Sequence, residues 1–424
     1  MADVQAFSCW LPDPTLAAEV AALPYDVFSR TEAAAEIAAH PRSFLRIDKS
    51  CALLPACDEY DPQVYTLAAE LLAADERAGI YQRESMPNYY LYRLEQNGVC
   101  QTGVVTTVAT DDYRSGVVRR HENTRALKRS DRIHHIEALQ AQTGPVFLTY
   151  HSQDNINRLM DEQIRDAEPL IDFIAPDGVR HSIWRVDDLA RQQALTTAFA
   201  AVHTLYIADG HHRAAAAAAV GSTRFLAILF PSHQLHIYDY NRVIEGLNGL
   251  NREDLLARIG QDFEVTPAVG TPAAGTPAAS TPAAGTPAAS TQPFRPTQRG
   301  EFGLYLRDGA WSSWYVLRVR EGRRPDDAVS GLDVSILHDL LLGPQLKITD
   351  PRSDPRISYV GGVFGLEELE RRVDALPGEQ GAAFALYPCT LDELFAVADS
   401  GRLMPPKSTW FEPKPRSGLF IYPL

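Results

Sequence analysis

Cysteine is scarce and irregularly spaced in this chain of 424 residues. The five cysteines are Cys9, Cys51, Cys57, Cys100 and Cys389, an odd number that contains no C-x-x-C pair. A disulfide framework requires paired cysteines and a structural zinc site requires clustered ones, so neither is indicated. The pattern predicts reduced thiols in a cytoplasmic protein.

The sequence also lacks a long apolar run and an excess of positive charge. No stretch approaches the roughly 18 apolar residues of a membrane span, and the first residues do not resemble a signal peptide. Lysine and arginine number 40 against 54 acidic residues, which gives a formal net charge of −14. Broad binding to nucleic acid or membrane surfaces depends on a basic field. We therefore expect neither partner and a cytoplasmic location, and the sequence leaves the oligomeric state open.

Hydrophobic periodicity predicts a mixed α/β (α+β) fold, because helical patterns alternate with strand-like runs. The helical patterns cover 30–40, 62–77, 125–142, 335–342 and 391–400. The strand-like runs cover 89–94, 104–108, 146–150, 203–207, 225–230, 302–306 and 314–319, and the last two resemble a hairpin. The order of these elements does not require a strictly parallel sheet.

Residues 271–290 repeat Thr-Pro-Ala-Ala-Gly/Ser four times. Proline at every fifth position forbids a continuous helix or an interior strand, and alanine and glycine bury little surface. We predict a disordered Pro/Ala insertion over 269–299 with no catalytic part. It would separate an α/β core, 1–268, which carries the phosphate site, from a C-terminal α/β portion, 300–424, which packs back on that core.

The most informative motif is the box Asp209-Gly-His-His-Arg213, which lies between an apolar run and six alanines, 214–219. This order predicts a strand, a tight turn and a helix. Unpaired N–H groups and the helix dipole favour an anion at a helix N-terminus. Asp209 is expected to cap the helix or to hold Mg²⁺ with a phosphate, Gly210 to make the turn, and Arg213 to bind two phosphoryl oxygens.

The same box has a structural interpretation, namely an Asp-capped helix whose His-His-Arg first turn is solvated. We favour a functional site because positive side chains at a helix N-terminus oppose the dipole. Their clustering calls for an anion to balance them.

A second charged cluster, residues 118–132, precedes the helical pattern at 125–142. Arg119, Arg120 and Lys128 could bind a polyphosphate, and Glu122 beside His121 is a possible general base. A solvated, salt-bridged helix start is the alternative, and this cluster taken alone favours it.

The loop 403–414 contains prolines, aromatic residues and lysines, and is too apolar for a free tail. We predict that it docks against the body with Lys407, Ser408 and Lys414 lining a cleft. No nucleotide-binding or hydrolase motif with fixed spacing, such as G-x-x-x-x-G-K-[ST], G-x-G-x-x-G or G-x-S-x-G, occurs in the sequence.

The chain resembles a prokaryotic family, domain-of-unknown-function family 1015, over nearly its whole length. The matching segments are 24–27, 43–45, 120–124, 128, 131–132, 206–213, 331–335, 404–409, 413–414 and 417–418. The Pro/Ala repeat departs from the family pattern.

The DGHHR box is also similar to the phosphate-handling box of the ParB and sulfiredoxin superfamily, which includes free L-serine kinases. This resemblance implies a ParB/sulfiredoxin-like core with additional α/β elements. Sulfiredoxins carry a cysteine where this chain has His211, so thiol-based repair is disfavoured. ParB partition proteins add a basic DNA-binding domain, which this acidic chain lacks. The kinase resemblance survives both comparisons.

We therefore expect a Mg²⁺-dependent phosphotransferase acting on a small hydroxyl metabolite, most simply a free L-serine kinase that uses a nucleotide or pyrophosphate. The expected catalytic residues are Asp209, which also holds the metal, His211, His212 and Glu122. The expected phosphate-binding residues are Gly210, Arg213, Arg120, His121, Lys128, Lys407 and Ser408. The alternatives are a phosphatase acting on a phosphoserine-like substrate at the same site, or a regulatory protein that binds a nucleotide or phosphometabolite without turnover.

Overall fold

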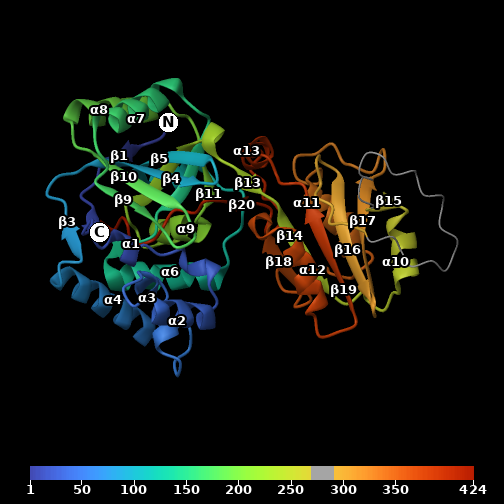
Figure 1. Ribbon diagram of the computed structural model, residues 1–424. Helices are drawn as coiled ribbons and strands as arrows, with labels where there is room; N and C mark the ends of the chain where they lie inside the picture. Colours follow the sequence, from blue (N-terminus) through green and yellow to red (C-terminus); the bar gives the residue numbers. More distant parts are fainter. Residues whose placement is uncertain (269–290) are drawn as a thin grey trace, which may run out of the picture. The chain divides into compact units, whose positions relative to one another are not determined.

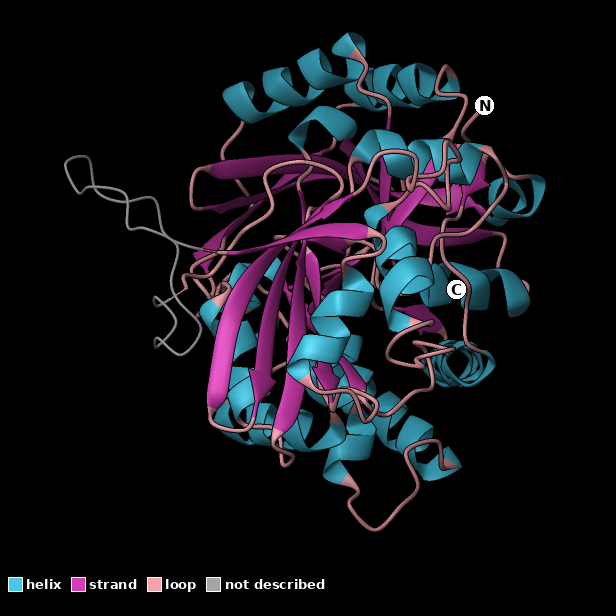
Figure 2. Ribbon diagram, turned by 90° about the vertical axis from the view of Figure 1, so that its right-hand side faces the viewer, coloured by secondary structure: helices cyan, strands magenta, loops and turns pink. Residues whose placement is uncertain are grey.

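The computed structural model describes residues 1–268 and 291–424 and divides into two compact units (Figure 1). Unit 1 contains residues 1–236 and 411–424, and unit 2 contains residues 237–410. Helices border strands in both, as Figure 2 shows, so the predicted mixed α/β class is confirmed. The ParB/sulfiredoxin-like core remains a prediction.

Unit 1 contains short strands at the chain ends, a large sheet and helices in several layers. Its helices are α1 (Ala17–Val20), α2 (Arg30–Ala39), α3 (Leu45–Asp48), α4 (Pro62–Arg77), α5 (Thr110–Ser115), α6 (Ala126–Leu139), α7 (Asp154–Asp166), α8 (Leu189–Ala200) and α9 (His211–Ala219), with 3-10 turns η1 (Tyr25–Val27), η2 (Ser50–Leu53) and η3 (Ser232–Gln234). Its strands are β1 (Val4–Gln5), β2 (Trp10–Pro12), β3 (Tyr81–Arg83), β4 (Tyr89–Gln96), β5 (Val99–Ala109), β6 (Val118–Arg119), β7 (Ala141–Gln142), β8 (Val146–Tyr150), β9 (Ile171–Ile174), β10 (Arg180–Val186), β11 (Leu205–Asp209), β12 (Arg224–Pro231) and β21 (Tyr422–Pro423).

The large sheet of unit 1 has the order β6-β11-β8-β12-β5-β4-β10-β9, and β1 pairs with β5. The pairs β6/β11 and β8/β12 are parallel, and the remaining pairs are antiparallel. The central strands are buried along their length, and Val, Ile, Leu and Phe predominate in β8 and β12. Such residues suit a strand that is covered on both faces.

Two apolar cores lie in unit 1. In the first, Met160 of α7 and Phe199 of α8 pack with sheet residues such as Leu148. In the second, Phe44 and Leu72 belong to a cluster formed by α2, α3, α4 and α6. Figure 1 shows α7 and α8 above the sheet and α4 and α6 below it.

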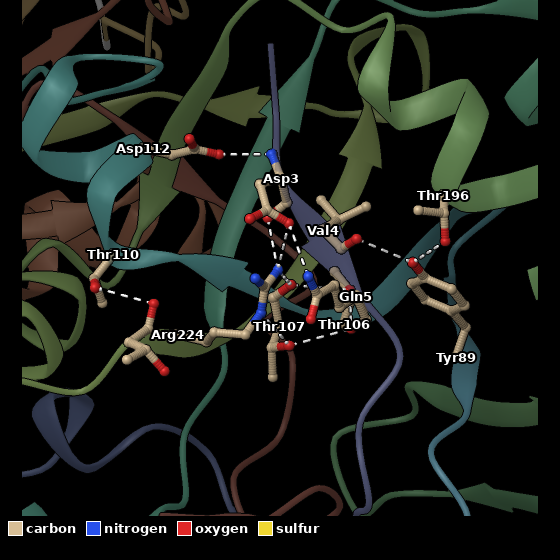
Figure 3. Close-up of polar contacts among 11 residues, drawn as sticks. Asp3, Val4, Gln5, Tyr89, Thr106, Thr107, Thr110, Asp112, Thr196 and Arg224 are labelled. Carbon is tan, nitrogen blue, oxygen red and sulfur yellow. Dashed lines mark hydrogen bonds and ion pairs between the residues drawn. The ribbon is translucent and has the colours of Figure 1, made fainter. Parts of the chain in front are cut away.

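Side chains of the large sheet and of α5 bond to the backbone of the N-terminal segment (Figure 3). The backbone N–H of Asp3 donates to Asp112 at 2.7 Å, and Arg224 donates to the carbonyl of Asp3 at 2.7 Å. The hydroxyl of Tyr89 donates to the carbonyl of Val4 at 3.2 Å. These bonds add to the few backbone bonds that hold this segment, such as the one from the N–H of Ala109 to the carbonyl of Asp3 at 3.0 Å.

Unit 2 is built on an antiparallel sheet. Its elements are β13 (Ile237–Tyr238), β14 (Tyr240–Glu245), α10 (Arg252–Ile259), β15 (Phe263–Pro267), β16 (Glu301–Asp308), β17 (Trp311–Val319), α11 (Asp333–Leu337), the π-helical turn η4 (His338–Leu342), β18 (Ile357–Gly361), the 3-10 turn η5 (Gly362–Phe364), α12 (Glu367–Asp374), β19 (Gln380–Leu386) and α13 (Leu391–Asp399). The strand order is β15-β17-β16-β19-β14-β18. Leu369 and Val373 of α12 pack on Trp314, Val243 and Ala383 of this sheet. The short strand β20 (Trp410–Phe411) spans the boundary at which the chain returns to unit 1.

The two units begin and end at different residues from the predicted domains. Residues 240–245 belong to unit 2 because β14 pairs with β18 and β19 of the same sheet. Residues 411–424 belong to unit 1, where Gln101 donates to the carbonyl of Pro413 at 2.8 Å. Sequence periodicity does not reveal such long-range pairing.

The predicted disordered insertion, 269–299, needs a correction at its C-terminal end. Thr291 bonds to Ser313 at 2.9 Å, and the N–H of Gln292 donates to Ala268 at 2.9 Å, so these residues belong to the folded part of unit 2. The Pro/Ala repeat at 271–290 lies outside the described residues.

None of the helices in the ranges 1–268 and 291–424 combines the length and apolar character needed to cross a bilayer.

Candidate functional site

The two charged segments found in the sequence follow neighbouring parallel strands. In the register of β6 and β11, Leu205 lies opposite Val118 and Tyr206 opposite Arg119. The carboxyl ends of parallel strands lie at the same edge of a sheet. At this edge the chain continues from β11 into α9 and from β6 into the segment that leads to α6. The topology therefore brings the DGHHR box and the 120–128 segment together.

The DGHHR box adopts the predicted strand, turn and helix. Asp209 ends β11, Gly210 has φ 96° and ψ 26°, and α9 begins at His211. The N-cap is Gly210 and not the predicted Asp209, and glycine has no side chain that could bond to the helix amides. A glycine tolerates this left-handed conformation, which strains other residues.

The carboxylate of Asp209 faces Arg213 instead. Arg213 donates to Asp209 Oδ2 at 2.7 Å and to the carbonyl of Pro145, and its side chain is 15% exposed. Its guanidinium lies close to the backbone on both sides, since a Cβ added at Gly210 or Gly144 would approach it to 3.0 or 3.3 Å. The two glycines therefore make room for the arginine at the start of α9.

His212 links α9 to the start of α6. Its Nε2 atom accepts a hydrogen bond from the backbone N–H of Arg125 at 3.0 Å, and Arg125 is the N-cap of α6. An accepting Nε2 carries no proton, so the neutral ring bears its proton on Nδ1. Like α9, α6 has no side-chain cap. Two helix N-termini without side-chain caps therefore meet at one histidine.

His121 and His211 lie in direct ring contact. Their ring centroids are 4.6 Å apart, the planes are 88° to each other, and both side chains are buried. Among the described residues, the buried Nε2 atom of His211 has no hydrogen-bond partner. His121 lies between β6 and α6, so this contact joins the two charged segments within the core.

Burial keeps the histidines of the site neutral. It lowers the pKa of His121 to about 4 and that of His212 to about 4, and positive charges at Lys128 and Arg125 contribute to the shift at His212. Burial, with His121 as a neighbour, also lowers the pKa of His211 well below its usual value. The expectation of three positive side chains in the box is therefore wrong. Arg213 alone carries a positive charge there at neutral pH.

The other predicted residues of unit 1 lie near the histidines at the start of α9. Lys128 lies in the first turn of α6, where its charge acts on His212. Arg120 is exposed, and its charge acts on His211. Glu122 is partly buried in the same connection between β6 and α6. Asp26 of η1 is a carboxylate that the sequence analysis did not select, and its charge opposes the pKa shift of His212.

A small cavity adjoins Arg213, and its wall contains a second group of residues that the sequence analysis missed. It is lined by Arg213, Tyr25, Asp48, Arg132, His135, Thr143, Gly144 and Ser417, among others. The guanidinium of Arg132 lies 3.9 Å from the centre of the Tyr25 ring and pairs with Asp131 at 2.8 Å. Thr143 donates to Asp48 at 2.8 Å. The signal for these residues was present in the Pro24-Tyr-Asp-Val27 and Asp131-Arg132 segments, which carried part of the family resemblance.

Two of the three predicted residues of the C-terminal loop, Lys407 and Ser408, belong to unit 2. Lys407 is exposed and Ser408 is buried, and both precede the boundary at 410. Lys414 lies in unit 1, where its Nζ atom donates to the carbonyl of Phe411 at 3.2 Å. The assignment of Lys407 and Ser408 to the phosphate site stays a prediction.

A metal site made of protein side chains alone is not found in the described ranges. No three or more His, Cys, Asp or Glu residues there are grouped so that they could hold an ion. Mg²⁺ usually binds one or two carboxylates and completes its shell with phosphate and water. Asp209 therefore fits a Mg²⁺ ligand only together with a bound phosphate.

Comparison with solved structures gives distant similarities. A free serine kinase in complex with AMP aligns with a TM-score of 0.34 at 15% identity, covering 72% of this chain and 86% of that chain. SbnI with a C-terminal truncation, from Staphylococcus aureus, aligns with a TM-score of 0.34 at 12% identity, covering 74% and 84%. A conserved hypothetical protein from Pyrococcus furiosus aligns with a TM-score of 0.32 at 14% identity, covering 74% and 93%.

Comparison with curated protein sequences gave no match. Residues 4–335 match the family described as "Protein of unknown function (DUF1015)", and this match covers most of the chain. The chain belongs to the DUF1015 family.

Proposed function

We propose that this protein is a Mg²⁺-dependent phosphotransferase that acts on a small hydroxyl metabolite, with free L-serine as the acceptor. One observation carries the proposal. The N-termini of α6 and α9 meet at the carboxyl ends of two parallel strands, beside Arg213, and neither N-cap residue, Arg125 or Gly210, caps its helix with its side chain. Helix N-termini without caps and an adjacent guanidinium favour a phosphoryl group.

In this proposal the phosphoryl group replaces Asp209 as the partner of Arg213. The ion pair between Asp209 and Arg213, at 2.7 Å, holds the guanidinium at the start of α9 before the donor binds. A phosphate offers the same planar guanidinium two oxygens. The carboxylate of Asp209 would then be free to hold a Mg²⁺ ion that binds together with the donor phosphates. The metal neutralises phosphate charge.

The neutral histidines position the phosphoryl group without adding charge. His212 accepts from Arg125 through Nε2 and keeps Nδ1–H as a donor. Lys128 and Arg120 bind the remainder of the donor, and most of the rate comes from positioning and charge neutralisation.

Glu122 takes the proton of the acceptor hydroxyl in this proposal. It follows His121, and it lies in the same connection between β6 and α6 as Arg120. Asp26 is a second carboxylate whose charge acts on His212. The variants Glu122→Gln and Asp26→Asn separate the two, because loss of the base lowers kcat and removes the acidic limb of its pH profile.

L-serine is proposed as acceptor because the DGHHR box is similar to that of free L-serine kinases. The donor is proposed to be a nucleotide or pyrophosphate. The neighbouring structures bound to AMP and ADP make a nucleotide the first donor to try.

Phosphorus NMR tests the proposal directly. The purified protein is incubated with Mg²⁺ and L-serine and with ATP, ADP or pyrophosphate in separate samples, and a fourth sample contains O-phosphoserine alone. Formation of phosphoserine in any of the first three supports the kinase and identifies the donor. Phosphate release in the fourth sample alone would replace the kinase with a phosphatase, and no reaction in any sample would overturn phosphotransfer to serine.

A further inference from the structure

Unit 2 contains a buried arginine that belongs to no ion pair among the described residues. Arg242 lies on β14, opposite Tyr359 of β18 and Phe384 of β19, and is only 4% exposed. It donates to the carbonyls of Tyr240 and Lys407, the latter at 3.0 Å. No described carboxylate oxygen lies within 4.0 Å of its guanidinium. Its bonded partners in the described residues are neutral.

A buried charge without a counter-charge is energetically unfavourable. Hydrogen bonds to carbonyls satisfy the N–H groups of Arg242 but leave its positive charge unbalanced. Burial lowers the pKa of Arg242 to about 10, so the group remains charged at neutral pH. An anion beside the guanidinium would remove this imbalance.

Arg242 lines a small pocket whose carboxylates already have other partners. The wall includes Tyr240, Arg299, Asp333, Cys389, Glu393 and Ser408. Asp333 accepts the N–H of Gly300 at 2.9 Å and pairs with Arg324 at 3.2 Å, and Glu393 pairs with Arg299 at 2.6 Å. These two carboxylates and two arginines balance one another. The positive charge of Arg242 therefore has no counter-charge among the residues of the pocket wall.

The loop over this pocket is held in a strained conformation. Lys407 has φ 59°, a left-handed value that is uncommon outside glycine, and its carbonyl accepts from Arg242. The Nζ atom of Lys407 lies 5.4 Å from the centre of the Tyr240 ring. The hydroxyl of Ser408, also in the pocket wall, donates to Pro405 at 2.6 Å. Strained backbone of this kind occurs most often at binding sites.

We propose that unit 2 contains its own binding site for a small oxyanion of the phosphate type, centred on Arg242 and bordered by Arg299 and Ser408. The guanidinium offers a planar, two-pronged donor to such an anion. The Arg299 guanidinium adds further donors, and the hydroxyl of Ser408 would have to turn from the carbonyl of Pro405 to add one. This site is independent of the proposed phosphotransfer at α9.

Hydrogen–deuterium exchange of the full chain with inorganic phosphate as probe tests this site. In the wild-type protein, millimolar phosphate is expected to slow exchange about threefold or more in peptides covering 386–390 and 403–410. Acetate at equal ionic strength is the second arm. Equal protection by acetate would replace the phosphate-type ligand with a carboxylate, and no protection of either peptide by phosphate would overturn the site.

Three variants locate the effect. Arg242→Gln is expected to abolish the protection of both peptides, and Arg242→Lys, which keeps the charge, to weaken it. Arg307→Gln is the matched control, because Arg307 also donates to carbonyls in unit 2, those of Asp374 and Leu376, but lies outside the pocket wall. Unchanged protection in a folded Arg242→Gln protein would overturn the proposal. If that variant does not fold, the wild-type and Arg242→Lys measurements decide.

Arg213→Gln distinguishes this site from the one at α9. It is expected to remove any phosphate effect on a peptide covering 205–213 and to leave the protection at 403–410 intact. Failure of the phosphotransferase assay would therefore not affect this result.

Discussion

The imidazole of His212 accepts the backbone N–H of Arg125 through Nε2 at 3.0 Å, across 87 positions of sequence. This bond satisfies an amide at the start of α6, where no side chain caps the helix. It also fixes the tautomer of a histidine in the first turn of α9. This hydrogen bond therefore links the two helix N-termini that the pairing of β6 with β11 brings together, and the proposed phosphate site depends on both.

Replacing His212 by alanine is expected to abolish turnover with little loss of fold. The side chain is partly buried, but its bond to the exposed Arg125 N–H can be replaced by water, so its loss costs about 0.5–1.5 kcal/mol. His212→Gln, whose amide oxygen can accept the same N–H, should recover part of the activity. Phosphorus NMR for turnover and thermal unfolding for stability measure the two effects. Normal activity in His212→Ala would remove this histidine from the mechanism.

Asp209→Asn is expected to abolish turnover, by about 100-fold or more, because the amide neither pairs with Arg213 by charge nor binds Mg²⁺ well. Asp154→Asn is the control, since Asp154 is an exposed aspartate in the first turn of α7. Steady-state kinetics at several Mg²⁺ concentrations would show the loss. An Asp209→Asn protein with wild-type kcat would contradict the proposed metal ligand.

Gly210 and Gly221 lie on either side of α9. Comparing Gly210→Ala with Gly221→Ala separates the effect of backbone strain from the effect of a changed phosphate site. Both positions have positive φ, 96° and 78°, so each variant should lose about 1–2 kcal/mol of unfolding free energy. Only at Gly210 would the new Cβ meet the Arg213 guanidinium, at 3.0 Å, whereas Gly221 has open space. Phosphate binding should therefore weaken in Gly210→Ala alone. Equal binding in both variants would refute the role of Arg213.

Acid is expected to destabilise the folded chain between about pH 6.5 and 4. Burial lowers the folded-state pKa of His121 to about 4 from an ordinary value of 6.5. In this window the unfolded chain binds a proton that the folded chain does not, so the unfolding free energy decreases as the pH falls. The full stabilisation is present above pH 6.5, and the loss for His121 is about 3 kcal/mol by pH 4.

Denaturant unfolding at a series of pH values measures this dependence. His121→Asn should reduce the slope between pH 6.5 and 4, and the exposed His203→Asn should leave it unchanged. Identical slopes in the wild type and His121→Asn would contradict the assignment.

Deletion of residues 271–290 is expected to leave activity and thermal stability close to wild type. The flanks already lie together, since the N–H of Gln292 donates to the carbonyl of Ala268 at 2.9 Å. A short connection can therefore replace the repeat without moving β15 or β16. Differential scanning calorimetry and the phosphotransfer assay test this, and a large loss in either would show that the repeat contributes to the folded protein.

The sequence by itself determined the elements that carry the proposed site. A continuous apolar run predicts β11 and the alanine run predicts α9. The glycine between them supplies the positive φ that the turn requires. These features are local, because side-chain periodicity and backbone sterics act over a few residues. For this reason the predicted first and last residues of α4, 62 and 77, agree with those in the structure.

Only the tertiary structure decided which residues share the site and which are charged. The parallel pairing of β6 with β11 brought His121 to His211, and burial made these histidines neutral where the sequence suggested cations. The same fold pairs the carboxylate of Asp209 with the guanidinium of Arg213. Strand pairing and burial depend on contacts distant in sequence, and local patterns do not contain them.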